Sequence, residues 1–166
     1  MSTVIQTQLP VKEYLSTGHH PDVDYVDGRL EERNVGEKEH GKLQLRIAIL
    51  LKAMPNVFPF IETRLKVSET RYRVPDVCVY LDREPDEQVF TAAPFLCVEI
   101  LSPEDRMNRT LSVVQDYLAM GVPQVWILDP WEKKAYLVDS AGLRPVTGQI
   151  GATSSRVTLP IGEIFG

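Results

Sequence analysis

The sequence has few of the features that place a protein in a membrane, in a secretory pathway or in a disulfide-rich scaffold. Its two cysteines, Cys78 and Cys97, are too few for a disulfide framework or a thiolate zinc site, and they form no C-x-x-C pair. The longest apolar runs, residues 47–51 and 95–98, are far shorter than the roughly 20 residues that span a bilayer. The N-terminus has neither a basic cluster nor a long apolar segment. We therefore expect a cytoplasmic protein with reduced thiols and no membrane contact.

Basic charge is also scarce. The chain has 18 Lys and Arg residues against 23 Asp and Glu residues, which gives a formal net charge of −5 at pH 7. The field of the whole molecule would not attract a polyanion, so any contact with nucleic acid needs a local basic patch or bound cations. With 166 residues, of which 43% are hydrophobic and 25% charged, the composition is typical of a globular protein. We expect one domain over residues 1–166.

Hydrophobic periodicity predicts an α/β fold with a mixed central sheet flanked by helices. Apolar residues at helical spacing predict a short helix near residues 11–15 and long helices over residues 37–54 and 103–120. The predicted strands are short and extended, and they cover residues 24–26, 29–33, 57–67, 72–81, 95–101, 124–128, 134–138, 143–146 and 156–159. The strand, helix and strand over residues 95–128 require a right-handed parallel crossover, whereas the earlier hairpin is antiparallel. The central sheet must therefore be mixed.

Two acidic residues are difficult to explain as structural elements alone. Asp76 and Glu99 both lie inside apolar strands, where an ionised carboxylate without partners costs several kcal/mol. Strand alternation lets both side chains face one point if the strands are neighbours, and Pro75 places Asp76 at an edge or a disruption. Two converging carboxylates without soft ligands suit Mg²⁺ or Mn²⁺. We predict a metal site at this pair, the alternative being a protonated or helix-capping pair.

A series of short motifs resembles known nucleases. The motifs are YVDG (25–28), EHG (39–41), VPDV (74–77), VEILSP (98–103), DY (116–117) and GVPQVWILDP (121–130). In this order they resemble a large bacterial family of restriction-endonuclease-like proteins of unassigned substrate, within the PD-(D/E)XK nuclease superfamily, over residues 14–138. The resemblance implies the restriction-endonuclease-like fold, a divalent metal and the hydrolysis of DNA phosphodiester bonds.

The sequence departs from the superfamily pattern at its lysine. The position two residues after Glu99 is Leu101, and the position in the next helix where this family often has a basic residue is Val113. Arg106 and Arg109 in that helix can neutralise a phosphate, but arginine is too basic to act as a general base. A metal-bound hydroxide would then be the nucleophile.

The start of the long helix over residues 37–54 adds two candidates. His40 extends the inner apolar stripe of this helix, so its side chain should point toward the sheet. There it contacts a phosphate or a metal-bound water, or it is satisfied by a neighbouring backbone group or acid. Glu39 resembles the acid that many nucleases of this fold carry on their first helix, although it lies off the inner stripe.

The hairpin over residues 57–81 predicts a phosphate-binding patch. A two- or four-residue loop pairs Arg64 with Arg73 and Lys66 with Arg71, which places four cations on one face. Directly opposed like charges destabilise a strand pair unless an anion lies over them. The same alternation places Glu62 on the cationic face, away from the predicted metal ligands, unless a bulge intervenes. A three-residue loop with another register, or a solvated charged face, is the alternative.

Three functions stay open at this point. The first is a metal-dependent endonuclease acting on DNA, which we expect to be a homodimer because cutting a duplex needs two sites. The second is a catalytically inactive nuclease-like domain that binds nucleic acid or a protein partner, and the missing lysine supports it. The third is a metal-dependent hydrolase of a small phosphate ester. The motifs favour the first.

Overall fold

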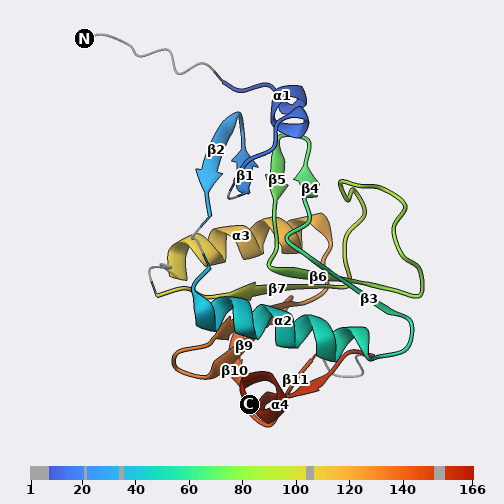
Figure 1. Cartoon of the computed structure of the whole chain (residues 1–166), viewed down its shortest axis with the longest axis vertical. Helices are drawn as coiled ribbons and strands as arrows, with labels where there is room; N and C mark the ends of the chain where they lie inside the picture. The colour runs from blue at the N-terminus through green and yellow to red at the C-terminus, as the bar shows by residue number, and fades with distance from the viewer. Residues whose placement is uncertain (1–7, 21, 34–35, 104–106, 152–155) are drawn as a thin grey trace.

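A six-stranded sheet forms the centre of the protein (Figure 1). The computed structural model describes residues 8–20, 22–33, 36–103, 107–151 and 156–166. In the order β10-β9-β8-β7-β6-β3, the strands are β3 (Val57–Ile61), β6 (Val77–Leu81), β7 (Leu96–Ile100), β8 (Val125–Asp129), β9 (Lys134–Asp139) and β10 (Gly142–Val146). Strands β7 and β8 are parallel, and the other neighbouring pairs of this sheet are antiparallel. The predicted mixed sheet with its parallel crossover is confirmed.

Two long helices cover opposite faces of this sheet. Helix α2 (Lys38–Lys52) packs its stripe of Leu43, Ile47 and Leu51 on the face that contains Val77, Val79, Leu96 and Val98. Helix α3 (Met107–Met120) packs Val113, Val114 and Tyr117 on the face that contains Cys78, Tyr80, Cys97 and Ile127. Successive strand residues point to opposite faces, so both faces are apolar and both need a cover. Figure 1 shows β6 and β7 between α3 and α2.

A second, four-stranded sheet of order β2-β1-β5-β4 lies at one end of the molecule. It contains β1 (Val23–Val26), β2 (Arg29–Glu32), β4 (Leu65–Ser68) and β5 (Arg71–Arg73), and helix α1 (Val11–Ser16) packs on it through Tyr14. Asp27 and Gly28 both have positive φ, 50° and 89°, as the central residues of a tight two-residue hairpin turn do. The predicted ribbon at this turn is confirmed.

The predicted continuous hairpin over residues 57–81 is wrong. Its outer halves, β3 and β6, belong to the large sheet, whereas β4 and β5 belong to the small one. The chain changes sheet where Glu62 adopts φ 47°, a left-handed conformation that ends strand geometry. On the returning strand Pro75 lacks the N–H that would continue the ladder. This change of sheet leaves Asp76 at the end of the large sheet, directly before β6.

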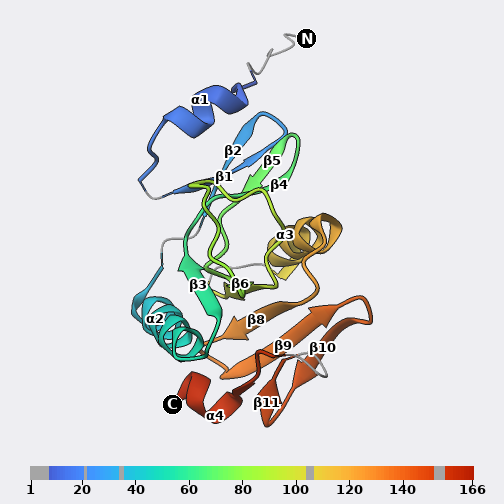
Figure 2. The same cartoon turned by 90° about the vertical axis from the view of Figure 1, so that its right-hand side faces the viewer.

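The C-terminal region differs from the prediction in detail. A two-stranded sheet of β11 (Gln149–Ile150) and β12 (Leu159–Pro160) replaces the longer strand expected over residues 156–159. The chain then forms helix α4 (Ile161–Phe165), which packs beside α2 (Figure 2). Among the described residues, no helix has both the length and the apolar character needed to cross a lipid bilayer.

A buried arginine links the small sheet to α3. Arg73 on β5 is 2% exposed, and its guanidinium donates hydrogen bonds to Asp24 at 3.1 Å, Glu31 at 2.8 Å and Asp116 at 2.8 Å. Asp24 also accepts a hydrogen bond of 3.0 Å from the backbone N–H of Val74. One cation thus joins β1, β2, β5 and α3, and it compensates the buried charge of Asp24.

Replacing Arg73 with methionine should lower the free energy of unfolding by about 3–5 kcal/mol, because the substitution leaves the carboxylate of Asp24 buried without its partner. Equilibrium urea unfolding followed by circular dichroism measures this loss. Arg83→Met is the matched control, since Arg83 and Asp86 form a surface pair and are 79% and 81% exposed. A loss at Arg73 no larger than that of the control would contradict the linking role.

Candidate active site

Asp76 lies directly before β6, at the end of the large sheet. It is 4% exposed, and its Oδ1 accepts a hydrogen bond from Nη2 of Arg33 at 2.9 Å. Its Oδ2 accepts the backbone N–H of Ile100 at 2.7 Å and lies 3.3 Å from Nε2 of His40. These partners come from the segment after β2, from the end of β7 and from the start of α2. They fix the carboxylate where the three segments meet.

Glu99 reaches the same place from β7. The hydroxyl of Tyr117 on α3 donates to its Oε1 at 2.6 Å. Burial, followed by the charge of Asp76, raises the pKa of Glu99 well above its usual value, although the Tyr117 hydrogen bond and the charge of Arg33 oppose the shift. The surroundings of Glu99 therefore disfavour its ionised form.

The two acids line one small cavity. It has a volume of about 30 Å³, which is room for one or two water-sized groups. Arg33, His40 and Arg109 line it together with Asp76 and Glu99. The structure thus brings both predicted metal ligands to one point, together with His40 and Arg109. Arg106 lies outside the described residues.

The cavity contains a cation that the sequence did not reveal. Arg33 has the charges of Asp76 and Glu99 nearby, and although burial lowers its pKa, these charges raise it above the usual value. It therefore stays protonated. The guanidinium of Arg109 donates to the backbone carbonyl of Glu32 at 2.8 Å and reaches the cavity from α3. No sequence signal predicts the position of Arg33, because it depends on where the small sheet packs.

His40 is buried, as predicted, and faces Asp76. Burial by itself lowers its pKa, but the hydrogen bond and charge of Asp76 outweigh burial and raise it. Gln44, one helical turn later, donates to the backbone carbonyl of Asp76 at 2.9 Å. The i, i+4 spacing of His40 and Gln44 on one helix face is a signal that could have identified Gln44.

Two other predicted positions are corrected by the structure. Glu62 does not lie away from Asp76, because its left-handed φ breaks the alternation. Its N–H donates to the carbonyl of Asp76 at 3.4 Å, and its Oε1 accepts from Gln44 at 3.4 Å. Glu39 does not line the cavity. Its carboxylate pairs with Lys42 at 3.5 Å and Lys38 at 3.9 Å at the helix surface.

The predicted pairing of cations across the hairpin is wrong. Arg73 lies opposite Leu65, Lys66 opposite Tyr72, and Arg71 opposite Ser68 across a bulge. The four cations therefore do not share one face: Arg71 and Arg73 share a face and both contact Asp116, whereas Lys66, opposite Tyr72, lies on the other face. Each cation is paired with oxygen atoms of the protein. Arg64 donates to the carbonyls of residues 15 and 17, Lys66 pairs with Glu69, and Arg71 pairs with Asp27 and Asp116. The register that supported a phosphate patch here does not exist.

The donors at the cavity fit a small hard cation. Mg²⁺ is usually bound through one or two carboxylates, with water completing its shell, and Asp76 and Glu99 supply two. Burial and the charge of Asp76 raise the pKa of Glu99, and a cation beside the carboxylate would lower it again. Among the residues that the structure describes, no group of three or more His, Cys, Asp or Glu forms a fuller cage. A cation here would share Asp76 with Arg33 or displace it.

A mixed sheet with a parallel crossover, flanked by helices and carrying two acids at one edge, defines a restriction-endonuclease-like α/β protein. The chain belongs to the Uma2 family, described as "putative restriction endonuclease", which it matches over residues 8–159. Its structure is similar to the crystal structure of a "putative nuclease" from Anabaena variabilis, with a TM-score of 0.79 and 20% sequence identity. The match covers 93% of this chain and 96% of that one. Among curated proteins, none matches this chain. The resemblance drawn from the motifs is confirmed.

In the metal-free protein, the pKa of His40 should lie above its ordinary value of 6.5. Asp76→Asn should lower it, because the substitution removes the carboxylate charge and leaves the burial. NMR of the imidazole protons across pH measures both values, and His40→Gln assigns the resonance.

The stability effect of this pair has a definite sign. A histidine whose pKa is higher in the folded than in the unfolded protein stabilises the fold when it is protonated. This stabilisation is complete below the pKa of the unfolded state, and it is lost as the pH rises through the pKa of the folded state. The contribution of His40 should therefore be present at mildly acidic pH and fade above it. An unchanged His40 pKa in Asp76→Asn would show that the ion pair does not set it.

Proposed function

We propose that this protein is a metal-dependent endonuclease that hydrolyses DNA phosphodiester bonds. The observation that carries the proposal is the convergence of Asp76 and Glu99, from two neighbouring strands, on a cavity that also contains His40 and Arg33. The descriptions of the family and of the structural neighbour, restriction endonuclease and nuclease, support it.

In this proposal Asp76 and Glu99 hold Mg²⁺ or Mn²⁺. The ion would polarise the scissile phosphate and lower the pKa of a bound water. The chain orients both ligands: the N–H of Ile100 fixes Asp76, and the hydroxyl of Tyr117 fixes Glu99. Because the pKa of Glu99 is raised in the metal-free site and a metal binds the ionised carboxylate, metal binding competes with protonation of Glu99.

Arg33 supplies the positive charge that the superfamily places on its lysine. It remains protonated and lies within hydrogen-bond distance of the metal ligand Asp76. Its planar guanidinium suits the negative charge that builds on phosphate oxygens in the transition state. Because arginine does not accept a proton at neutral pH, Arg33 stabilises charge and does not activate the water. Arg109 lies in position to assist it.

A nuclease-like domain that binds nucleic acid without cutting it is the second candidate. The Arg33–Asp76 ion pair favours it, since this contact already satisfies one oxygen of a predicted metal ligand. In that case, DNA binding would hardly depend on Mg²⁺ and would survive Asp76→Ala. A hydrolase of small phosphate esters would instead turn over a generic phosphodiester and leave polynucleotides intact.

Calorimetric titration with Mg²⁺ and Mn²⁺ should show binding to the wild type, accompanied by proton uptake by the buffer. Asp76→Asn and Glu99→Gln should lose metal binding and plasmid nicking together, with rates at least about 100-fold lower, because each removes one of the two charged ligands. Asp86→Asn is the matched control, since this acid pairs on the surface with Arg83.

The outcomes separate the candidate functions. Nicking that survives both substitutions would overturn the assigned centre. DNA binding without metal binding would establish the inactive domain. Size-exclusion chromatography with light scattering on the same samples tests the homodimer that we propose as the acting form, since cutting both strands of a duplex needs two sites.

A further inference from the structure

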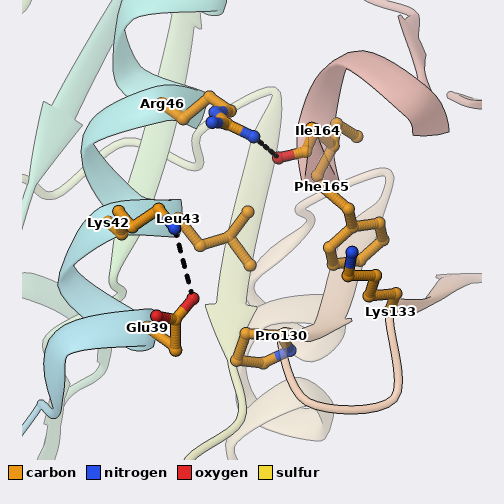
Figure 3. A pocket seen from close by; sticks show the side chains of 9 residues that line it. Glu39, Lys42, Leu43, Arg46, Pro130, Lys133, Ile164 and Phe165 are labelled. Carbon is orange, nitrogen blue, oxygen red and sulfur yellow. Dashed lines mark hydrogen bonds and ion pairs between the residues drawn. The ribbon is translucent and has the colours of Figure 1, made fainter.

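A second pocket lies on the other side of the N-terminal half of α2 (Figure 3). Its volume is about 170 Å³, and the side chains of Lys42, Arg46 and Lys133 contribute three cations to its lining. Glu39 is the acid among its lining residues, and Phe165 of α4 forms part of an apolar wall. The pocket is therefore positively charged in a chain whose formal net charge is −5.

Two parts of the fold contribute residues to both this pocket and the Asp76–Glu99 cavity: helix α2 and the carboxyl ends of β7 and β8. On α2, His40 faces the cavity, whereas Lys42 and Arg46, two and six residues later, face the pocket. Six residues correspond to about 9 Å along a helix. Strands β7 and β8 are parallel, so their carboxyl ends lie at one sheet edge. Ile100 at the end of β7 lines the cavity, and Lys133 in the loop after β8 lines the pocket.

The cations of the pocket are available to an anion. Lys133 is exposed, and within the described part of the chain no acid pairs with it. Lys42 is 58% exposed and pairs with Glu39 at 3.5 Å, a surface contact that contributes little free energy. Arg46 donates to the carbonyl of Ile164 at 3.4 Å and keeps further N–H groups on its guanidinium.

We propose that this pocket binds a backbone phosphate of the nucleic acid strand that is cut in the Asp76–Glu99 cavity. The inference rests on the proposed function and adds the local basic patch that a polyanion needs on an acidic protein. Phosphates follow one another at about 3.4 Å of axis per strand, so a strand that crosses the cavity brings later phosphates to the pocket. Lys42 and Lys133 are the contacts, and Glu39 opposes them.

Fluorescence anisotropy with a labelled DNA duplex tests this inference. The titrations contain EDTA, so that no metal-dependent cleavage occurs, and they are repeated at several salt concentrations. Lys42→Ala with Lys133→Ala should weaken binding roughly tenfold and reduce the slope of log K against log salt by about one. Glu39→Gln should tighten binding, since it removes the competing carboxylate.

The matched control is Lys52→Ala with Lys134→Ala. It removes the same charge from the same helix and from the first residue of β9, next to Lys133. Lys52, however, lies over Phe58, and Lys134 pairs with Glu132. Equal losses in the two double variants would overturn the proposal, since net charge would then explain both. Circular dichroism melting of each variant verifies that it is folded before its affinity is compared.

The remaining outcomes separate this inference from the proposed function. If the wild type nicks plasmid with Mg²⁺ but the Lys42/Lys133 variant binds DNA as the control does, the phosphate pocket alone fails. If the wild type neither binds nor cuts DNA, both fail. Calorimetric titration with inorganic phosphate tests whether the pocket binds free phosphate instead of a phosphate of DNA. Phosphate binding that is lost in the variant while DNA binding is unchanged would assign the pocket to free phosphate and overturn the proposal.

Discussion

The burial of two carboxylates side by side is the constraint on which the rest of the structure depends. Burial raises the pKa of Glu99, and the charge of Asp76 raises it further. Arg33 and the N–H of Ile100 donate hydrogen bonds to Asp76, and the hydroxyl of Tyr117 donates one to Glu99. Such a cluster contributes little to stability by itself, and we propose that it attracts a cation to a defined point. In our account that tendency is the basis of function.

The fold places this cluster by breaking a hairpin. The left-handed conformation of Glu62 and the proline at 75 move the chain from the large sheet to the small one and back. As a result, Asp76 lies before the first residue of β6 and beside the end of β7. Arg33 follows β2 of the small sheet. The buried Arg73 of that sheet donates a hydrogen bond to Asp116 of α3, the helix that also contains Tyr117. The two sheets thus meet at the cavity through charge as well as through apolar packing.

Local patterns were enough to predict most of the fold and the centre of the site. Apolar periodicity identified α2 and the parallel crossover, and an acid inside an apolar strand identified Asp76 and Glu99. The position of Arg33 could not be predicted, because a charged residue after a ribbon becomes a cavity cation only through the packing of one sheet on another. The hairpin register failed because β4 and β5 pair Leu65 with Arg73 and have a bulge between Lys66 and Ser68, which the sequence did not reveal.

The measurement that tests this account most directly is a crystal structure of the wild type grown with MnCl₂, with anomalous data collected near the manganese edge. We expect an anomalous peak bound by carboxylate oxygens of both Asp76 and Glu99, with Arg33 moved away from Oδ1 of Asp76. A cavity without a peak at millimolar Mn²⁺, in which Arg33 keeps its 2.9 Å contact with Asp76, would contradict the metal-dependent site.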